Sequence, residues 1–252
     1  MNEAERLHAA LHTVGERLAG VLEDARFERR NGYTAMSFPT FPVPAFNGVW
    51  ADSNVAAAEL ENERLELERL GLPFGVTVRT GRTPEVEETA RTLGLTSELR
   101  MPGMVVTPDE LRAPSAEEVQ IIGIETADGL AQALAVAAAG FEIPADFLAA
   151  IYLLEVAELE GMRYYLARVD GRDVSTAVGF TVDETVGIFN VATPPEHRGH
   201  GYGAAITAQA VDDGFAAGAE LSWLQSSALG ESVYRRLGFR AVESYVLFYG
   251  PD

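Results

Sequence analysis

The 252-residue chain contains no lysine and no cysteine, and each absence excludes particular chemistries. Without lysine there is no Schiff-base residue for pyridoxal phosphate, no phosphate-binding lysine of a Walker A loop and no kinase strand lysine. Without cysteine there is no thiolate nucleophile, no disulfide and no cysteine-ligated zinc site. A cysteine-free chain is compatible with a reducing cytoplasm, which is the location we expect.

Positive charge and long apolar runs are also scarce. Nineteen arginines oppose 38 acidic residues, which gives a net charge of −19. Nucleic acids and anionic membranes attract basic surfaces, so we expect neither as a partner. The most apolar run, residues 130–141, is too short to span a bilayer, and charges interrupt the first 18 residues before a signal-peptide core can form.

The remaining composition, 47% hydrophobic and 23% charged residues, is that of a folded globular protein. Two prolines and several acids make residues 107–118 a candidate linker, and we divide the chain there. Apolar periodicity predicts helices at 2–21, 56–70, 83–93, 128–139, 145–160, 203–218 and 230–238, and strands at 32–38, 45–50, 72–79, up to 106, 119–124, 163–169, 175–182, 186–193, 220–225 and 245–250. Asp170 and Gly171 suit a hairpin tip. This order predicts an α+β (mixed α/β) fold.

The two halves also share short matches that indicate an internal duplication. Phe46–Asn47 recurs as Phe189–Asn190, and the Arg-Thr-Leu-Gly of the first half recurs as Arg-Arg-Leu-Gly in the second. Gly71 and Gly218 each precede a predicted strand. Such self-similarity at nearly constant spacing is typical of duplicated units.

The sharpest local signal is HRGHGYG, residues 197–203, between a predicted strand and a predicted helix. Its glycines allow positive φ and a close approach of a ligand to the backbone. The N–H groups at the start of the helix, with Arg198 beside them, form an anion site in an otherwise acidic protein. The loop does not match the dinucleotide pattern G-x-G-x-x-G, and many glycine-rich turns are simple connections, so the loop alone indicates anion binding and no activity.

Residues 119–252 resemble the GNAT acetyltransferases. The pyrophosphate loop of that family reads Arg or Gln, two residues, Gly, one residue, then Gly or Ala, which corresponds here to Arg198, Gly201 and Gly203. The strand before it resembles the family's central strand, which separates from its neighbour to admit the pantetheine arm of acetyl-CoA. The resemblance implies direct transfer of acetyl to an amine, with no covalent enzyme intermediate.

By the same resemblance, the backbone N–H of Val191 faces the thioester carbonyl and Tyr234 protonates the departing thiolate. Ser227 stands where many members have asparagine, which changes one expected contact with the coenzyme. A packed helix tyrosine is the alternative reading of Tyr234. The implied contacts with acetyl-CoA are at Val191, Ala192, Thr193, Arg198, Gly199, His200, Gly201, Tyr202, Gly203, Ala204, Ser227 and Tyr234.

No general base stands out. The candidates are Glu142, Glu155, Glu158 and Glu184, each of which also suits a solvated surface, and a water relay would need none of them. We expect no metal. His8 and His12 have helical i, i+4 spacing, but no third ligand or HExxH motif accompanies them.

For several other charged residues, a role on the solvent-exposed surface and a role in binding the coenzyme are both open. His197 and His200 flank the glycine loop and could neutralise phosphate or simply be exposed. Arg235, Arg236 and Arg240 are expected to compensate acids, with contact to the nucleotide end of the coenzyme as the alternative. A serine hydrolase lacks its G-x-S-x-G turn.

We therefore expect two GNAT-like lobes, each a mostly antiparallel sheet flanked by helices, with residues 1–118 degenerate and 119–252 active. The first lobe has no arginine-glycine loop and carries Ala90 where the second carries Tyr234. The expected function is acetyl-CoA-dependent N-acetyl transfer to a small cationic amine or a peptide amine. The alternative is an acyl-CoA-binding regulatory or scaffolding module without turnover. The resemblance also allows a homodimer.

Overall fold

The structure, a computed structural model, describes residues 1–114 and 118–250. The chain forms two compact units, and each unit is discontinuous in sequence. Unit 1 comprises residues 1–17 and 103–242, and unit 2 comprises residues 18–102 and 243–250. This grouping differs from a division at residue 118, because the first helix groups with the later part of the chain and the final strand groups mainly with the earlier part.

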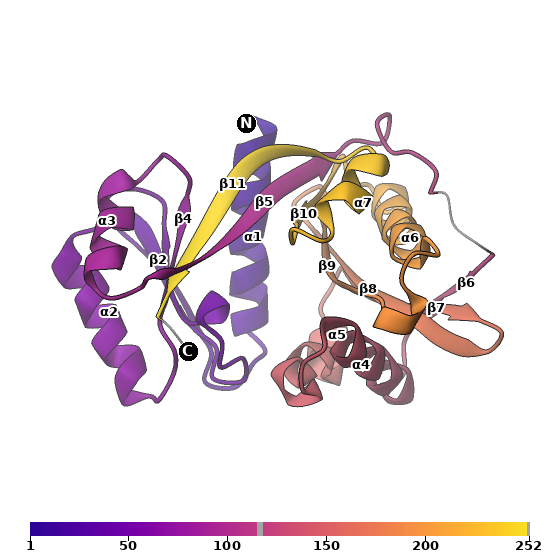
Figure 1. Cartoon of the computed structure of the whole chain (residues 1–252), viewed down its shortest axis with the longest axis horizontal. Helices are drawn as coiled ribbons and strands as arrows, with labels where there is room; N and C mark the ends of the chain where they lie inside the picture. Colours follow the sequence, from indigo (N-terminus) through magenta and orange to yellow (C-terminus); the bar gives the residue numbers. More distant parts are fainter. Residues whose placement is uncertain (115–117, 251–252) are drawn as a thin grey trace. The chain divides into compact units, whose positions relative to one another are not determined.

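Unit 1 contains a mixed sheet with strand order β5-β10-β9-β8-β7-β6 (Figure 1). Only β9 and β10 are parallel, and the other neighbours whose register is recorded are antiparallel. The strands are β5 (Ser97–Val106, of which unit 1 contains the last residues), β6 (Gln120–Ile124), β7 (Met162–Val169), β8 (Arg172–Val182), β9 (Thr185–Ala192) and β10 (Leu221–Gln225).

Helices cover both faces of this sheet, because alternate side chains of β7 are buried in two different apolar clusters. Tyr164 and Leu166 pack in a cluster with α4 (Ala127–Phe141), whereas Tyr165 and Ala167 pack in a second cluster with α6 (Tyr202–Ala216). Successive strand residues point to opposite faces, so the two clusters lie on opposite sides. The other helices are α1 (Glu3–Ala19, up to residue 17 in this unit), α5 (Leu154–Ala157), α7 (Glu231–Arg236) and the 3-10 turns η2 (Ala145–Phe147), η3 (Ala149–Tyr152) and η4 (Pro195–His197).

Unit 2 contains a smaller mixed sheet with strand order β1-β2-β3-β4-β11. Its elements are β1 (Arg26–Arg30), β2 (Tyr33–Ser37), η1 (Pro44–Phe46), β3 (Gly48–Ala51), α2 (Ala57–Arg69), β4 (Gly75–Arg79), α3 (Pro84–Thr92) and most of β11 (Arg240–Tyr249). Leu60 and Leu67 of α2 and Val86 of α3 pack in one apolar cluster with β3, β4 and β11. Both helices therefore cover the same face.

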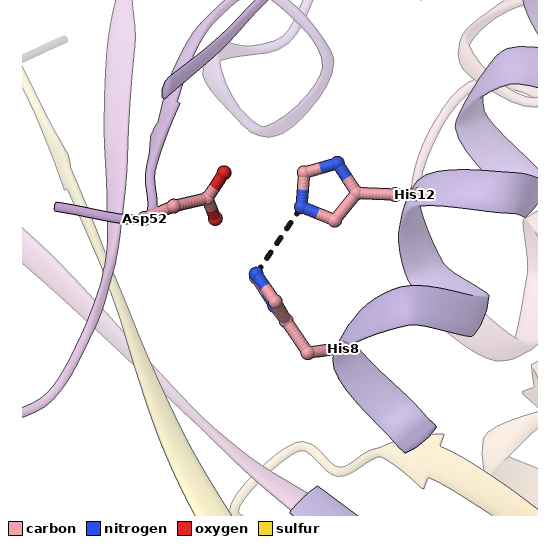
Figure 2. Close-up of side chains that lie close together, drawn as sticks. All are labelled: His8, His12 and Asp52. Carbon is pink, nitrogen blue, oxygen red and sulfur yellow. Dashed lines mark hydrogen bonds between the residues drawn. The ribbon is translucent and has the colours of Figure 1, made fainter. Parts of the chain in front are cut away.

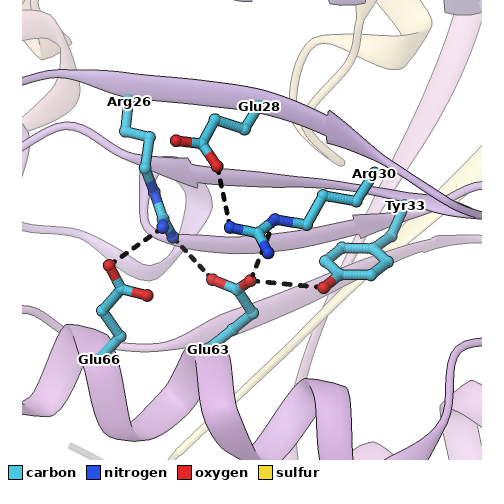
Figure 3. Close-up of polar contacts among 6 residues, drawn as sticks. All are labelled: Arg26, Glu28, Arg30, Tyr33, Glu63 and Glu66. Carbon is cyan, nitrogen blue, oxygen red and sulfur yellow. Dashed lines mark hydrogen bonds and ion pairs between the residues drawn. The ribbon is translucent and has the colours of Figure 1, made fainter.

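A buried carboxylate ties α2 to the edge of this sheet (Figure 3). Glu63 is 4% exposed, and its carboxylate lies 2.6 Å from the guanidinium of Arg26 and 3.5 Å from that of Arg30. The hydroxyl of Tyr33 donates to it at 3.4 Å. A buried charge requires such partners, and here two arginines supply them.

The two units share a topology. In unit 2, β1, β2 and β3 are antiparallel, α2 connects the parallel pair β3 and β4, and β11 is antiparallel to β4. In unit 1, β7, β8 and β9 are antiparallel, α6 connects the parallel pair β9 and β10, and β5 is antiparallel to β10. The last strand of each half of the sequence thus completes the sheet of the other half.

Helix ends repeat as well. Gly71 and Gly218 both have positive φ, and the residue after each donates to the carbonyl five positions back, Leu67 and Gly214. This is the Schellman pattern of helix C-termini. The matched dipeptides Phe46–Asn47 and Phe189–Asn190 do not occupy the same structural position. Asn47 precedes β3, whereas Asn190 lies within β9.

Most expected elements are confirmed, including the mixed α+β fold and the hairpin tip, where Asp170 and Gly171 have φ of 49° and 76°. The single helix expected at 145–160 is wrong. The chain forms η2, η3 and α5 there, and Leu153 is extended with φ −70° and ψ 149°. Strand β1 was not expected. The expected linker includes residues 115–117, which lie outside the described residues.

Candidate active site

The parallel strands β9 and β10 separate within unit 1. Their recorded pairing runs from Thr185 and Leu221 to Gly187 and Trp223, whereas β9 continues to Ala192. The last two residues of β10, Leu224 and Gln225, pair only with β5, on the other side of β10. This leaves a fork between the two strands, which is the separation that the resemblance implies.

A tryptophan lies where the fork begins. Trp223 is completely buried, and its indole N–H donates to the hydroxyl of Thr185 at 3.0 Å. Its ring meets that of Phe189 edge to face, with centroids 5.2 Å apart. A Cβ on Gly187 would lie 2.6 Å from the tryptophan ring, so only glycine fits beside it.

A β-bulge lies further along β9, inside the fork. Thr176 pairs with Ala192 and Val178 pairs with Phe189, so Ala177 alone opposes both Asn190 and Val191. Asn190 adopts a positive φ of 49°. In the recorded pairing Val191 has no partner in β8 or β10. A bulge of this kind releases backbone groups from the ladder, as the expected role of the Val191 N–H requires.

The glycine loop leads from the end of β9 into α6. Gly199 and Gly201 have φ of 88° and 86°, and Gly201 is the N-cap of the helix, without a capping side chain. The first N–H groups of a helix have no partners within the helix, so the start of α6 can receive an anion. A Cβ on Gly203 would lie 3.3 Å from the Thr193 hydroxyl, so the helix start lies close to the end of β9.

Arg198 binds protein groups around the loop. Its Nε donates to the Thr193 carbonyl at 3.1 Å, and an Nη donates to the Gly140 carbonyl at 2.8 Å. The same Nη lies 3.0 Å from the carboxylate of Glu142. The guanidinium therefore joins the loop to the C-terminal end of α4.

Ser175 and Gly140 also support the end of β9, and neither residue is part of a recognisable sequence pattern. The Ser175 hydroxyl donates to the Ala192 carbonyl and lies 2.9 Å from the Thr193 hydroxyl. A Cβ on Gly140 would lie 2.8 Å from that of Ala192. These residues come from β8 and α4, far from the loop in sequence.

Tyr234 lies on α7, after β10, and packs against the same apolar cluster as Val191 and Ala204. Its ring meets that of Phe239 with centroids 5.9 Å apart. Burial raises the pKa of the Tyr234 hydroxyl to about 12. Ser227 accepts a hydrogen bond from the Gly230 N–H at 3.2 Å and so shapes the turn before α7.

Burial also raises the pKa of other tyrosine hydroxyls of unit 1. They belong to Tyr152, Tyr164 and Tyr165. Tyr165 donates to the carboxylate of Asp213 at 2.9 Å, which favours the protonated hydroxyl further. All these groups are neutral at physiological pH.

The structure singles out no general base. Glu142, Glu155, Glu158 and Glu184 are all exposed. Glu142 is paired with Arg198, and Glu184 precedes β9 at the end remote from Val191. We therefore assign none of these four glutamates as the base that deprotonates the amine.

Several of the other histidines and arginines have local partners. The side chains of His8 and His12 meet beside α1 (Figure 2). Their Nε2 atoms lie 3.2 Å apart, and His12 is 3% exposed. The ring of His200 stacks on that of Tyr202. Arg235 pairs with Glu231, and Arg240 lies 3.1 Å from Glu110, which agrees with charge compensation.

The helices within the described parts of the chain are too short or too polar to cross a membrane.

Comparison with known proteins identifies the domain. Residues 160–241 match the acetyltransferase (GNAT) domain family. Among curated protein sequences, none matches this chain significantly.

Solved structures resemble the chain along most of its length. A GCN5-related N-acetyltransferase from Kribbella flavida is 21% identical with a TM-score of 0.73, and the match covers 98% of this chain and 95% of that one. A functionally unknown conserved protein from Staphylococcus epidermidis is 15% identical with a TM-score of 0.68, covering 92% and 97%. A GCN5-related N-acetyltransferase-like protein from Streptococcus suis is 13% identical with a TM-score of 0.59, covering 98% and 100%. At these identities the neighbours show the fold.

The family match and the fold together support an acyltransferase. The chain contains a GNAT acetyltransferase domain. Members of this family bind acetyl-CoA as co-substrate together with an acceptor.

Proposed function

We propose that this protein transfers the acetyl group of acetyl-CoA to an amine. The observation that carries the proposal is the fork between β9 and β10, which opens beside the glycine loop at the start of α6. The fork offers backbone groups to an extended arm, and the loop offers N–H groups to a diphosphate. Both features belong to unit 1, and the same strand leads from one to the other.

In this proposal the pantetheine arm lies along β9 from Val191 to Thr193. The N–H of Val191, which has no strand partner in the recorded pairing, donates to the thioester carbonyl. As the amine attacks, this oxygen becomes an oxyanion, and one preorganised donor stabilises such a charge by about 3 kcal/mol. The diphosphate lies against residues 199–204, at the positive end of α6.

Tyr234 supplies the proton that the leaving group needs. The amine forms a C–N bond, the C–S bond breaks, and the departing thiolate takes the proton of the Tyr234 hydroxyl. Because burial raises its pKa to about 12, that hydroxyl is protonated at physiological pH. An ordinary thiol has a pKa of roughly 8.5, so Tyr234 is the weaker acid and must act within the fork, where the thiolate is poorly solvated. The amine loses its proton to solvent, and the Tyr234 phenolate takes one proton from solvent, which restores the enzyme and balances the step.

We also propose that unit 2 is a degenerate copy of the same fold. Its topology matches that of unit 1, and Leu93 and Leu237 are the C-caps of the equivalent helices α3 and α7. The glycine after each helix has positive φ. The N–H of the residue after that glycine donates to the carbonyl of Ala90 in unit 2 and to the carbonyl of Tyr234 in unit 1. Alanine cannot donate a proton, so the chemistry is confined to unit 1.

Location and assembly are part of the proposal as well. We place the protein in the cytoplasm, and cell fractionation tests this. A homodimer is the assembly to examine, by light scattering of the full chain.

Two measurements on the full chain test the function. Acetyl-CoA should raise the melting temperature, and an amine panel should release free CoA thiol. The Tyr234→Phe variant should lower kcat by about a hundredfold and change the dissociation constant of acetyl-CoA little, because it removes only the proton donor.

Tyr249→Phe on β11 is the matched control and should behave as wild type. Binding without thiol release from any amine would favour the acyl-CoA-binding module. No thermal shift with acetyl-CoA would refute both.

A further inference from the structure

Exposed apolar side chains are concentrated in one short segment of unit 1. Ten large hydrophobic residues are exposed in the described parts of the chain, and five of them lie between residues 141 and 154. They are Phe141, Ile143, Phe147, Leu153 and Leu154, each between 39% and 44% exposed. Clustered exposed apolar residues mark binding surfaces, whereas single ones are ordinary.

The same segment is strongly acidic. Residues 141–161 contain five carboxylates and no basic residue. Apolar side chains interspersed with carboxylates suit a ligand that has an apolar body and a positive charge.

This segment begins beside the end of β9. A Cβ on Gly140, at the end of α4, would lie 2.9 Å from the backbone nitrogen of Thr193. Further along, Tyr152 packs in one apolar cluster with Ala192. The segment is thus anchored twice against the part of β9 where we place the acetyl group.

Two polar atoms buried at this place make no hydrogen bond of ordinary length and geometry. They are the hydroxyl oxygen of Tyr152, a residue that is 6% exposed, and Nδ2 of Asn190, although the Tyr152 hydroxyl lies near enough to Asn190 and Thr176 for both side chains to act on its pKa. Asn190 lies in the bulge, directly before Val191, and holds a positive φ. Buried polar groups normally form hydrogen bonds of good geometry, so a buried pair that forms none indicates that a ligand or a water completes the site.

We propose that the acceptor is a primary amine carried on an apolar aliphatic or aromatic body. Residues 141–154 bind the apolar body, and the Tyr152 hydroxyl accepts a hydrogen bond from the amine beside Val191. The segment consists of the one-turn pieces η2, η3 and α5, which open at lower cost than a long helix, so an acceptor can reach the buried atoms. This inference rests on the proposed function.

Binding of matched amines tests the acceptor class without requiring turnover. Calorimetry with the full chain saturated with CoA compares 2-phenylethylamine with spermidine, which has more charge and no comparable apolar body. We expect 2-phenylethylamine to bind at least tenfold more tightly. Equal or tighter binding of spermidine, or no binding of either amine, would overturn the inference.

Failure here is distinguishable from failure of the proposed function. If the protein acetylates spermidine efficiently but not 2-phenylethylamine, the acetyltransferase function stands and the acceptor class is wrong. If no amine in a broad panel releases thiol, the proposed function fails, whatever the calorimetry shows.

A first variant tests the surface. Phe147→Ala should lower kcat/KM for 2-phenylethylamine roughly tenfold, because it removes most of one aromatic contact, and should leave KM for acetyl-CoA unchanged. Leu70→Ala, which removes an exposed apolar side chain of unit 2, is the matched control. Equal losses in both variants would argue against a binding role for residues 141–154.

A second variant tests the buried hydroxyl. Tyr152→Phe keeps the ring and removes an oxygen that makes no hydrogen bond of ordinary geometry, so the melting temperature should stay the same or rise. The same variant should raise KM for the amine several-fold, with KM for acetyl-CoA unchanged. A lower melting temperature together with an unchanged amine KM would show that the hydroxyl serves the core and not the acceptor.

Discussion

Arg198 offers a test of how the coenzyme loop is held in place. Its guanidinium donates to the carbonyls of Thr193 and Gly140 and pairs with Glu142. The carbonyl of Gly140 lies in the last turn of α4, where partial negative charge accumulates and favours a cation. We predict that Arg198 positions the loop, and that Arg198→Gln weakens CoA binding by releasing the loop from α4 and β9.

The contacts set the size of the effect. The side chains of Arg198 and Glu142 are 44% and 62% exposed, so their ion pair contributes at most about 1 kcal/mol. The two carbonyl bonds contribute about 1 kcal/mol each, since they too are partly solvated. Arg198→Gln should therefore weaken binding by about 2–3 kcal/mol, or roughly 30- to 150-fold, whereas Glu142→Gln should cost about fivefold or less.

Calorimetric titration of the full chain with CoA is the assay. A direct contact between Arg198 and the diphosphate is the competing explanation, and it is separable by ionic strength. If Arg198 only positions the loop, Arg198→Gln should retain the salt dependence of wild-type binding, because the screened interactions remain. The reasoning is refuted if Arg198→Gln binds CoA as wild type does, if Glu142→Gln costs as much as Arg198→Gln, or if the salt dependence disappears.

Three further outcomes follow from packing and burial. Gly187→Ala forces a Cβ against Trp223 at the start of the fork, so chemical denaturation should show a loss of about 1–3 kcal/mol, and an unchanged stability would contradict the close contact. Glu63→Gln removes the buried charge that pairs with two partly exposed arginines and should cost about 2 kcal/mol without changing KM for acetyl-CoA, whereas a raised KM would connect unit 2 to catalysis. Stability should be independent of the buried tyrosines below pH 10, where folded and unfolded hydroxyls are both protonated, and should fall above pH 10 as the unfolded hydroxyls ionise first. Tyr234, with its pKa near 12, should ionise only near that pH or on unfolding, which absorbance at alkaline pH measures.

Local patterns were sufficient for the elements that depend on neighbouring residues. The hairpin tip at Asp170 and Gly171, the glycine loop before α6 and the helix that carries Tyr234 all form where the sequence predicts them. Each depends on backbone preferences or on apolar periodicity within a few residues.

The failed helix at 145–160 shows the limit of that reasoning. The apolar periodicity of residues 145–160 is real. However, the Tyr164 hydroxyl donates a hydrogen bond to the Ile151 carbonyl, and Tyr152 and Val156 are both buried. The extended Leu153 between them allows this burial. A partner from β7 thus overrides the local helix preference, and no window around residue 150 contains that information.

The sequence by itself determined the chemistry available to this protein, because the absence of lysine and cysteine and the spacing of Arg198, Gly201 and Gly203 are local properties of the chain. The tertiary structure alone decided where the strands separate, which carbonyls Arg198 binds and which half receives each final strand. These depend on contacts between residues distant in sequence, whose free energy arises only when the sheets and helices pack together.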